Sequence, residues 1–227
     1  SFFLCVVSGF LLWETVAVAR DIVARITTKA AAPQTVLIGG SMDAPPDLVV
    51  KAEKTLGATF VELRKLWPLS RAAKDVVRQL KEKGIDTSNG IVLVGYSWGG
   101  LVARQLDVDN PGLVKSVITI GSASGGYRFM PAGYFMPKDS ESRTPLYVIG
   151  GYDSRIPKKW FMNGTSEEND GIVSLESVFT IGRPTMAKVT FSGFDHFGLM
   201  KSREVTEQIS EWIMRESSEK VLFAATE

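Results

Sequence analysis

From residue 35 onward, short apolar runs alternate with longer stretches in which apolar residues recur every three or four positions. A short continuous apolar run indicates a strand that is buried on both faces, and the wider spacing indicates a helix with one buried face. Six strands are predicted, at residues 35–39, 58–63, 91–95, 115–120, 145–149 and 188–192. Because helical stretches separate most of them, we expect an α/β fold with a mostly parallel sheet and helices on both faces.

The helical stretches carry start and stop signals. One opens near residue 46 and is closed by Gly57. The next is expected to begin at Ser70, as its N-cap, and to stop at Gly84. The stretch 121–143 is too long for a simple connection between strands, so it is a candidate lid or substrate loop. Two further helices are predicted, at residues 98–106 and 202–214.

The first 33 residues form a different kind of segment. Residues 2–13 are almost wholly apolar and have the length of a signal-peptide core, but no positive residue precedes them. Glu14 follows, so the stretch is marginal as a membrane-spanning helix. Two interpretations stay open: a signal or anchor, which predicts a membrane-associated or secreted protein, or a helix packed on the globular body. We therefore divide the chain into an apolar segment, 1–33, and an α/β domain, 34–227.

The composition excludes several classes of function. The 227 residues carry 26 Lys and Arg against 25 Asp and Glu, a net charge of +1. Such a chain lacks the clustered positive charge of a nucleic-acid surface. A single cysteine excludes an intramolecular disulfide, and one cysteine with one histidine excludes the usual metal clusters of these residues. No nucleotide-binding glycine motif is present, so we expect no metal, no cofactor and no nucleic-acid partner.

One five-residue motif carries the chemistry. Gly95-Tyr96-Ser97-Trp98-Gly99 matches the G-x-S-x-G pattern and lies between a predicted buried strand and a predicted helix. In that setting the chain reverses sharply and presents the serine hydroxyl above the carboxyl edge of the sheet, at the N-terminus of a helix. The sequence therefore predicts Ser97 as a nucleophile.

A serine hydroxyl needs a base to become reactive, and the chain has one histidine. His196 follows the last predicted strand, which is where a fold with this nucleophile motif places the base. Two aspartates compete for the role of the acid that orients the imidazole. Asp153 follows the strand at 145–149, and Asp170 lies in a turn before an apolar stretch. From the residues alone, both remain candidates.

The negative charge that develops on a carbonyl oxygen during serine attack needs backbone N–H donors. One is the N–H of Trp98, the residue after the nucleophile. The other is expected from the loop after the first strand, where Gly39 and Gly40 leave the backbone free to turn. We predict that the N–H of Ser41 is this second donor of the oxyanion hole.

These motifs resemble those of the α/β-hydrolase family, and within it the small bacterial triacylglycerol lipases and related carboxylesterases. The resemblance covers most of residues 35–215 in the order of the elements, and its most specific parts are residues 94–100, 169–173 and 196–199. It implies the α/β-hydrolase fold with a minimal sheet of about six strands. In those lipases an N-D-G-[LIV]-V turn carries the catalytic acid, which implies Asp170 rather than Asp153.

The resulting prediction is a serine hydrolase that cleaves carboxylic esters through Ser97, His196 and Asp170, by way of an acyl-enzyme. Its substrate would be a small-molecule ester or a lipid. Since such a triad does not select the leaving group, a thioesterase, amidase, acyltransferase or haloperoxidase on the same fold stays open. A different class also stays open, namely a binding protein that keeps the fold without catalysis.

Overall fold

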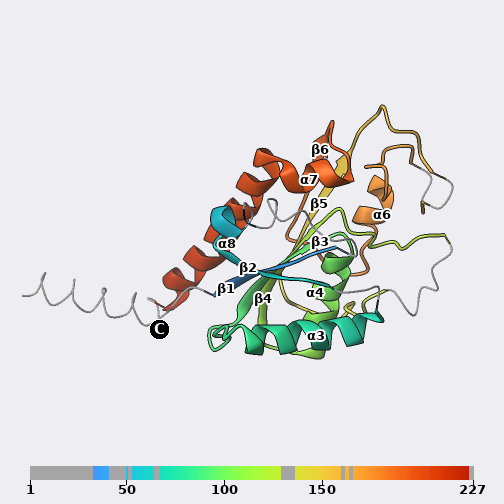
Figure 1. Ribbon diagram of the computed structural model, residues 1–227. Coiled ribbons are helices and arrows are strands. Elements are labelled where there is room, and N and C mark those ends of the chain that lie inside the picture. The colour runs from blue at the N-terminus through green and yellow to red at the C-terminus, as the bar shows by residue number, and fades with distance from the viewer. Residues whose placement is uncertain are drawn as a thin grey trace, which may run out of the picture. The chain divides into compact units, whose positions relative to one another are not determined.

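The structure is a computed structural model that describes residues 33–40, 50, 53–63, 67–128, 136–159, 162–163 and 166–224, with side chains up to residue 216. Its strands form one sheet in the order β2-β1-β3-β4-β5-β6, and every neighbouring pair is parallel (Figure 1). The strands are β1 (Gln34–Ile38), β2 (Ala58–Val61), β3 (Ile91–Tyr96), β4 (Val114–Ile120), β5 (Leu146–Tyr152) and β6 (Ala187–Ser192). The predicted sheet is confirmed, and it is parallel throughout.

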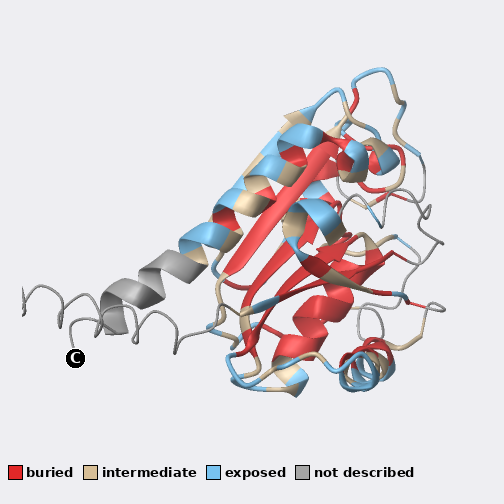
Figure 2. Ribbon diagram, turned by 60° about the vertical axis from the view of Figure 1, so that its left-hand side comes forward, coloured by how far each residue is buried: buried red, intermediate tan, exposed pale blue. Residues whose placement is uncertain are grey.

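Helices cover both faces of this sheet. They are α3 (Leu69–Glu82), α4 (Trp98–Asp109), α6 (Leu175–Phe179), α7 (His196–Lys201) and α8 (Arg203–Ala224). Side chains that alternate along β1 enter two separate apolar clusters: Val36 and Ile38 join the cluster with α3 and α4, whereas Leu37 joins the cluster with α8. In Figure 2 the inner strands β3, β4 and β5 are mostly red, and α4 is red over most of its length, whereas α3 and α8 expose their outer faces. The core therefore consists of two layers, one on each side of the sheet.

The start of α3 differs from the prediction. The helix begins at Leu69, so Ser70 lies inside its first turn and is not the N-cap. The cap residue is Pro68, and its carbonyl accepts hydrogen bonds from the N–H groups of Arg71 and Ala72. A proline has a fixed φ and no N–H to satisfy, so the helix starts here without a side-chain cap.

The C-terminal helical region also differs from the prediction of one helix over 202–214. A separate helix of six residues, α7, comes first, and α8 then runs from Arg203 to Ala224. Ser202 separates the two helices, and its hydroxyl accepts a hydrogen bond from the Val205 N–H at 3.2 Å. Helix α7 was not predicted because its six residues are too few to show a repeated apolar spacing.

Some predictions fall on residues that the structure does not describe. The apolar segment predicted over 1–33 lies outside the described residues apart from Pro33, and so does the middle of the 121–143 stretch. Membrane association and secretion therefore stay predictions. Within the described ranges, no helix has both the length and the apolar character needed to cross a membrane.

Candidate active site

Ser97 lies in a sharp turn between β3 and α4, with a φ of +54°. A residue other than glycine adopts this left-handed conformation only under constraint. The surrounding glycines let strand and helix approach closely, because a Cβ on Gly95 would lie 2.5 Å from the Gly100 Cα. A Cβ on Gly99 would lie 2.4 Å from the Gly39 carbonyl oxygen. The turn holds Ser97, which is partly exposed, at the carboxyl end of β3.

The imidazole of His196 joins this serine to an aspartate. Its Nε2 lies 2.9 Å from the Ser97 Oγ, and its Nδ1 lies 2.6 Å from the Asp170 Oδ2. An ionised carboxylate only accepts hydrogen bonds, so Nδ1 carries the proton and Nε2 can accept from the serine hydroxyl. His196 is 2% exposed and Asp170 is 1% exposed. The structure thus brings together, out of solvent, the base and the acid that the sequence analysis paired with Ser97.

The turn around Asp170 fixes its carboxylate. Oδ1 accepts hydrogen bonds from the N–H groups of Ile172 at 2.9 Å and Val173 at 2.7 Å. Gly171 has a φ of +93°, which lets the chain fold back over the carboxylate. The side-chain oxygen of Asn169 accepts the Gly171 N–H at 2.9 Å. The backbone therefore occupies one carboxylate oxygen and leaves the other for the imidazole.

The backbone of His196 is hydrogen-bonded to two neighbours, and the helix that it begins is capped by a third. Its N–H donates to the Asp170 carbonyl at 2.7 Å, and its carbonyl accepts the Tyr96 hydroxyl at 2.9 Å. Asp195 accepts the Gly198 N–H at 2.6 Å and so caps α7, whose first residue is His196. Burial, with a smaller contribution from the Asp170 charge, raises the pKa of Tyr96 well above its ordinary value. Tyr96 therefore keeps its proton and remains a donor.

The competing aspartate has a different partner. Asp153 accepts hydrogen bonds from the Arg155 N–H at 2.9 Å and from its guanidinium, where Nη2 lies 2.6 Å from Oδ2. These bonds lower the pKa of Asp153 to about 2. Among the described side chains, the carboxylate that hydrogen-bonds His196 is that of Asp170. The geometry therefore favours Asp170 over Asp153 as the acid.

The oxyanion donors are described only in part. Trp98 is the first residue of α4, at the end of the helix that carries partial positive charge. Ser41 lies outside the described residues. The loop that leads to it runs beside the nucleophile, because a Cβ on Gly40 would lie 3.4 Å from the Ser97 Cβ. The donor role of Ser41 therefore stays a prediction.

Two residues at this site were not predicted. Gly121 follows β4 with a φ of +55°, and a Cβ there would lie 3.3 Å from both the Asp170 Oδ2 and the His196 Nδ1. Tyr96 shares the apolar cluster of Val94 and α8. Alternation along the strand could have placed Tyr96 on that face, whereas nothing in the local sequence marks Gly121 as a neighbour of the imidazole.

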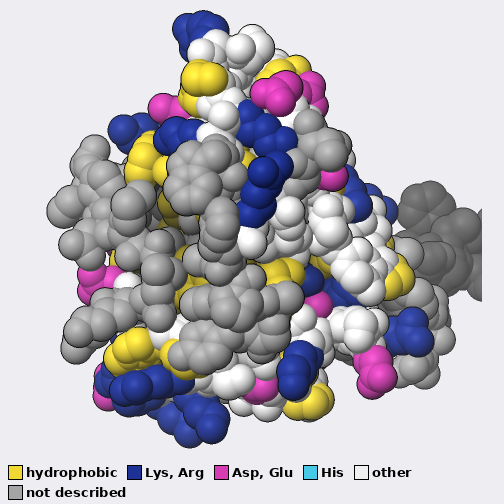
Figure 3. Space-filling model, turned by 90° about the vertical axis from the view of Figure 1, so that its right-hand side faces the viewer, with side chains coloured by type: hydrophobic (Ala, Val, Ile, Leu, Met, Phe, Trp, Pro, Cys, Tyr) yellow, Lys and Arg dark blue, Asp and Glu magenta, His cyan; other side chains and the backbone are white. Residues whose placement is uncertain are grey.

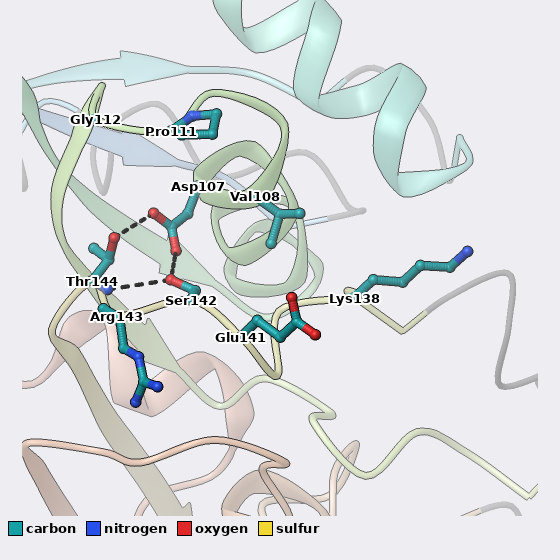
Figure 4. A pocket seen from close by; sticks show the side chains of 9 residues that line it. All are labelled: Asp107, Val108, Pro111, Gly112, Lys138, Glu141, Ser142, Arg143 and Thr144. Atoms are coloured by element: carbon teal, nitrogen blue, oxygen red, sulfur yellow. Dashed lines mark hydrogen bonds between the residues drawn. The ribbon is translucent and has the colours of Figure 1, made fainter.

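A pocket of about 410 Å³ lies away from these residues. Its lining comes from the end of α4 and from the segments that precede β4 and β5, namely Asp107, Val108, Pro111, Gly112, Lys138, Glu141, Ser142, Arg143 and Thr144. Strands β4 and β5 begin next to it, whereas Ser97 lies at the opposite, carboxyl ends of the parallel strands. In Figure 4 the Asp107 carboxylate is hydrogen-bonded to the hydroxyls of Ser142 and Thr144, each at 2.6 Å. This pocket is therefore not part of the Ser97 site.

The surface near α6 carries charges of both signs. Figure 3 shows this side of the molecule, on the right in Figure 1, with Lys and Arg side chains lying among Asp and Glu side chains. No histidine surface is visible among the described side chains of this face, in line with the burial of His196.

No family model and no curated protein matches the sequence. Solved structures match the fold. Est1E from Butyrivibrio proteoclasticus is 14% identical with a TM-score of 0.58, over 82% of this chain and 89% of that chain. Bacillus licheniformis lipase BlEst2 in mature form is 16% identical with a TM-score of 0.56, over 81% and 92%. MGS-MChE2, described as an alpha/beta hydrolase enzyme from a lagoon-sediment metagenome, is 16% identical with a TM-score of 0.55, over 82% and 92%. At such identities the likeness concerns the fold alone.

Proposed function

We propose that this chain, which has the α/β-hydrolase fold, is a serine hydrolase that cleaves carboxylic esters. The observation that carries the proposal is the hydrogen-bonded series from Ser97 through His196 to Asp170, with 2.9 Å and 2.6 Å between the joined atoms. Such a series activates a hydroxyl that is otherwise a weak nucleophile. Proteins named as a lipase and as an esterase are among the structures with the same fold, which agrees with an ester substrate.

In the proposed reaction, Ser97 Oγ attacks the ester carbonyl carbon while His196 Nε2 takes the hydroxyl proton. Asp170 orients the imidazole and stabilises the imidazolium that forms. The N–H groups of Trp98 and Ser41 would bind the oxyanion. The imidazolium then gives its proton to the alcohol oxygen as the C–O bond breaks, which leaves the acyl group on the serine. Water, deprotonated by the same imidazole, releases the carboxylic acid and restores the hydroxyl.

The proposed substrate class rests on a resemblance of two segments of the sequence. We propose a small-molecule ester or a lipid, because the Asn169-Asp170-Gly171 turn and the segment 196–199 resemble the corresponding parts of small bacterial lipases. The fold also hosts thioesterases, amidases, acyltransferases and haloperoxidases. A panel of acetate and butyrate esters, run beside the matching thioesters and amides, measures which leaving group the site prefers. We expect the highest kcat/KM for the oxygen esters.

The first test labels the nucleophile. A fluorophosphonate probe reacts with an activated serine, so we expect it to label the wild-type chain on Ser97 and to leave Ser97→Ala unlabelled. The matched control is Ser210→Ala, which changes a serine of α8 whose hydroxyl donates to the Thr206 carbonyl at 2.9 Å. That variant should be labelled like the wild type. Labelling that persists in Ser97→Ala, or no labelling of the wild type, contradicts the proposal.

The second test separates the two aspartates. Asp170→Asn should lower kcat by about 10⁴-fold, because an amide that faces the imidazole favours the wrong tautomer. Asp153→Asn should change kcat by less than about threefold, since its partner is Arg155 and not His196. Esterase kinetics with one substrate at saturating concentration measures both. A larger loss in the Asp153 variant would make Asp153 the acid.

A further inference from the structure

Phe197 directly follows His196 in the sequence. It is 44% exposed, whereas His196 is 2% exposed. Its ring meets the imidazole edge to face, with 5.9 Å between the ring centres and 84° between the planes. Other exposed large apolar residues in the described part of the chain are Val50, Met186 and Met214. The Phe197 ring therefore contacts the imidazole on one side and is exposed to solvent on another.

The remaining sides of the imidazole are already occupied. Nδ1 is bonded to Asp170, and the Tyr96 ring lies 5.0 Å away at a tilt of 36°. Tyr96 itself is only 9% exposed, so it lies on the interior side. Gly121 borders the edge that carries Nδ1 and Cε1, since a Cβ there would lie 3.3 Å from both atoms. Of the described residues whose ring or backbone borders the imidazole, Phe197 has the most exposed side chain, so an incoming molecule can contact its ring.

The chemistry of the proposed reaction places the alcohol half of the ester on the imidazole side of Ser97. The alcohol oxygen must receive its proton from His196 Nε2, so the alcohol half of the substrate lies next to the imidazole when the C–O bond breaks. Groups that flank the imidazole then contact the alcohol half rather than the acyl half. Phe197 flanks it, and its ring is both apolar and accessible.

We propose that Phe197 is the specificity-determining residue for the alcohol half of the substrate and selects esters of apolar, preferably aromatic, alcohols. This inference rests on the proposed ester hydrolysis and adds to it the class of the leaving group. An aromatic alcohol group packs against a phenylalanine ring edge to face or offset, with a gain that a methyl group cannot match. The carboxylate of Asp170 is hydrogen-bonded to the same imidazole, so an anionic alcohol group is disfavoured there.

The test uses the full chain and two esters with one acyl group, methyl acetate and benzyl acetate, both kept below their solubility limit. The ratio of their kcat/KM values reports the alcohol half, because kcat/KM covers the steps up to loss of the alcohol. In Phe197→Ala we expect the benzyl-to-methyl ratio to fall about tenfold, with kcat/KM for methyl acetate within about twofold of the wild type. Phe197→Leu keeps apolar surface without a ring, so it should give an intermediate ratio.

The matched control is Met186→Ala. Met186 is another exposed apolar side chain, 56% exposed, just before β6 and at the opposite end of that strand from His196. Its removal should leave the benzyl-to-methyl ratio unchanged. Thermal unfolding of each variant shows that the compared proteins are folded, and a series of acyl chain lengths on one alcohol should respond alike in the wild type and in Phe197→Ala.

Two outcomes overturn the inference. An equal loss for both esters in Phe197→Ala would make the ring a structural cover of the imidazole. An unchanged ratio would show that the alcohol half lies elsewhere. Each of these outcomes leaves the proposed function intact as long as Ser97→Ala is inactive on both esters, whereas an inactive wild type would contradict the proposed function first.

Discussion

At the scale of the residue, Gly121 shows how little space surrounds the hydrogen bond between His196 and Asp170. It is the first residue after β4, and its backbone has a φ of +55°. A Cβ on Gly121 would lie 3.3 Å from the Asp170 Oδ2 and equally far from the Cε1 and Nδ1 of His196. A side chain at this position would be strained in its backbone and crowded against the pair that must keep its geometry.

We therefore predict that Gly121→Ala costs about 1–2 kcal/mol of stability, through its left-handed backbone. It should also lower kcat by about tenfold to a hundredfold, because the crowded imidazole is displaced. Gly84→Ala is the matched control: its φ is +66°, and a Cβ there meets no atom within 4 Å. Urea unfolding and esterase kinetics should give a similar stability loss for the two variants and a loss of kcat for Gly121→Ala alone. Equal kcat values would mean that the imidazole tolerates the added methyl group.

Tyr96 contacts the same histidine at the backbone of His196 and not at the ring nitrogens, so Tyr96 is a positioning residue. Its hydroxyl donates to the buried His196 carbonyl at 2.9 Å. Tyr96→Phe leaves that carbonyl without this donor, which should cost about 1–3 kcal/mol of stability. Because the imidazole is then held less firmly, kcat should fall about three- to tenfold while KM changes by less than about twofold.

Tyr147→Phe is the control for this prediction. Its hydroxyl donates to Glu216, and its ring stacks on Trp212 of α8 with 4.9 Å between the ring centres. That variant should lose stability and keep kcat. If Tyr96→Phe kept its kcat as well, the hydroxyl of Tyr96 would be structural only.

At the scale of the element, a buried group of four charges ties α4 to two loops. Arg104 of α4 forms a two-point ion pair with Asp139, with distances of 2.7 Å and 2.8 Å. Arg183, which precedes β6, lies 3.1 Å from Asp107 of α4 and 3.3 Å from Asp139. All four side chains are at most 3% exposed. Because α4 begins directly after Ser97, this group anchors the helix that follows Ser97 to the loop that leads into β5.

We predict that Asp139→Asn destabilises the protein by about 3–5 kcal/mol, because it leaves buried guanidinium charge without its carboxylate. Glu141→Gln is the control, since Glu141 lies two residues away and is exposed, and it should change stability by less than about 0.5 kcal/mol. The urea midpoint and slope at neutral pH measure both. A midpoint of Asp139→Asn that equals that of the wild type would show that water or a neighbouring group replaces the lost charge.

At the scale of the whole molecule, the parallel direction of the strands assembles the site. The carboxyl ends of β3, β4, β5 and β6 meet at one edge of the sheet. Ser97 follows β3, Gly121 follows β4, and His196 follows β6. Asp170 comes from the long connection after β5 and reaches the histidine across 26 positions of sequence. No single segment contains the site, so its geometry depends on the fold of the whole sheet.

The free energy of unfolding should depend on pH in the acid range, because of the ion pair between Asp153 and Arg155. The Arg155 side chain and N–H lower the pKa of Asp153 from 3.8 to about 2. A carboxyl whose pKa is lower in the folded state stabilises the fold above its unfolded pKa and loses that contribution as the pH falls through its folded pKa. The difference in urea midpoint between the wild type and Asp153→Asn should therefore be constant above about pH 4 and shrink towards pH 2.

Arg155→Gln removes the partner instead of the carboxyl, so it should abolish the same part of the pH dependence. Urea midpoints at steps of half a pH unit measure all three proteins. If the difference between the wild type and Asp153→Asn stayed constant down to pH 2, the ion pair would contribute nothing to the acid sensitivity of the fold.

The sequence by itself determined the α/β fold class, the parallel sheet, and Ser97 and His196 as candidates. Continuous apolar runs of strand length, separated by helical spacing, predicted all six strands to within three residues at each end. The G-x-S-x-G turn and the only histidine of the chain were equally local signals. The predicted start of α3 was wrong because Pro68, and not Ser70, is the residue that caps the helix. Helix α7 was not predicted because six residues are too few to show a helical period.

Only the tertiary structure decided which contacts form around the histidine. From the local sequence, Asp153 and Asp170 were both candidates for the acid. In the structure Asp153 is hydrogen-bonded to Arg155, and Asp170 is hydrogen-bonded to His196. Tyr96 and Gly121 reach the same histidine from two other strands. Local spacing reports which face of a strand or helix is buried, because that depends on residues a few positions apart. The meeting of side chains from distant segments depends on strand order and direction, which are set when the whole sheet packs.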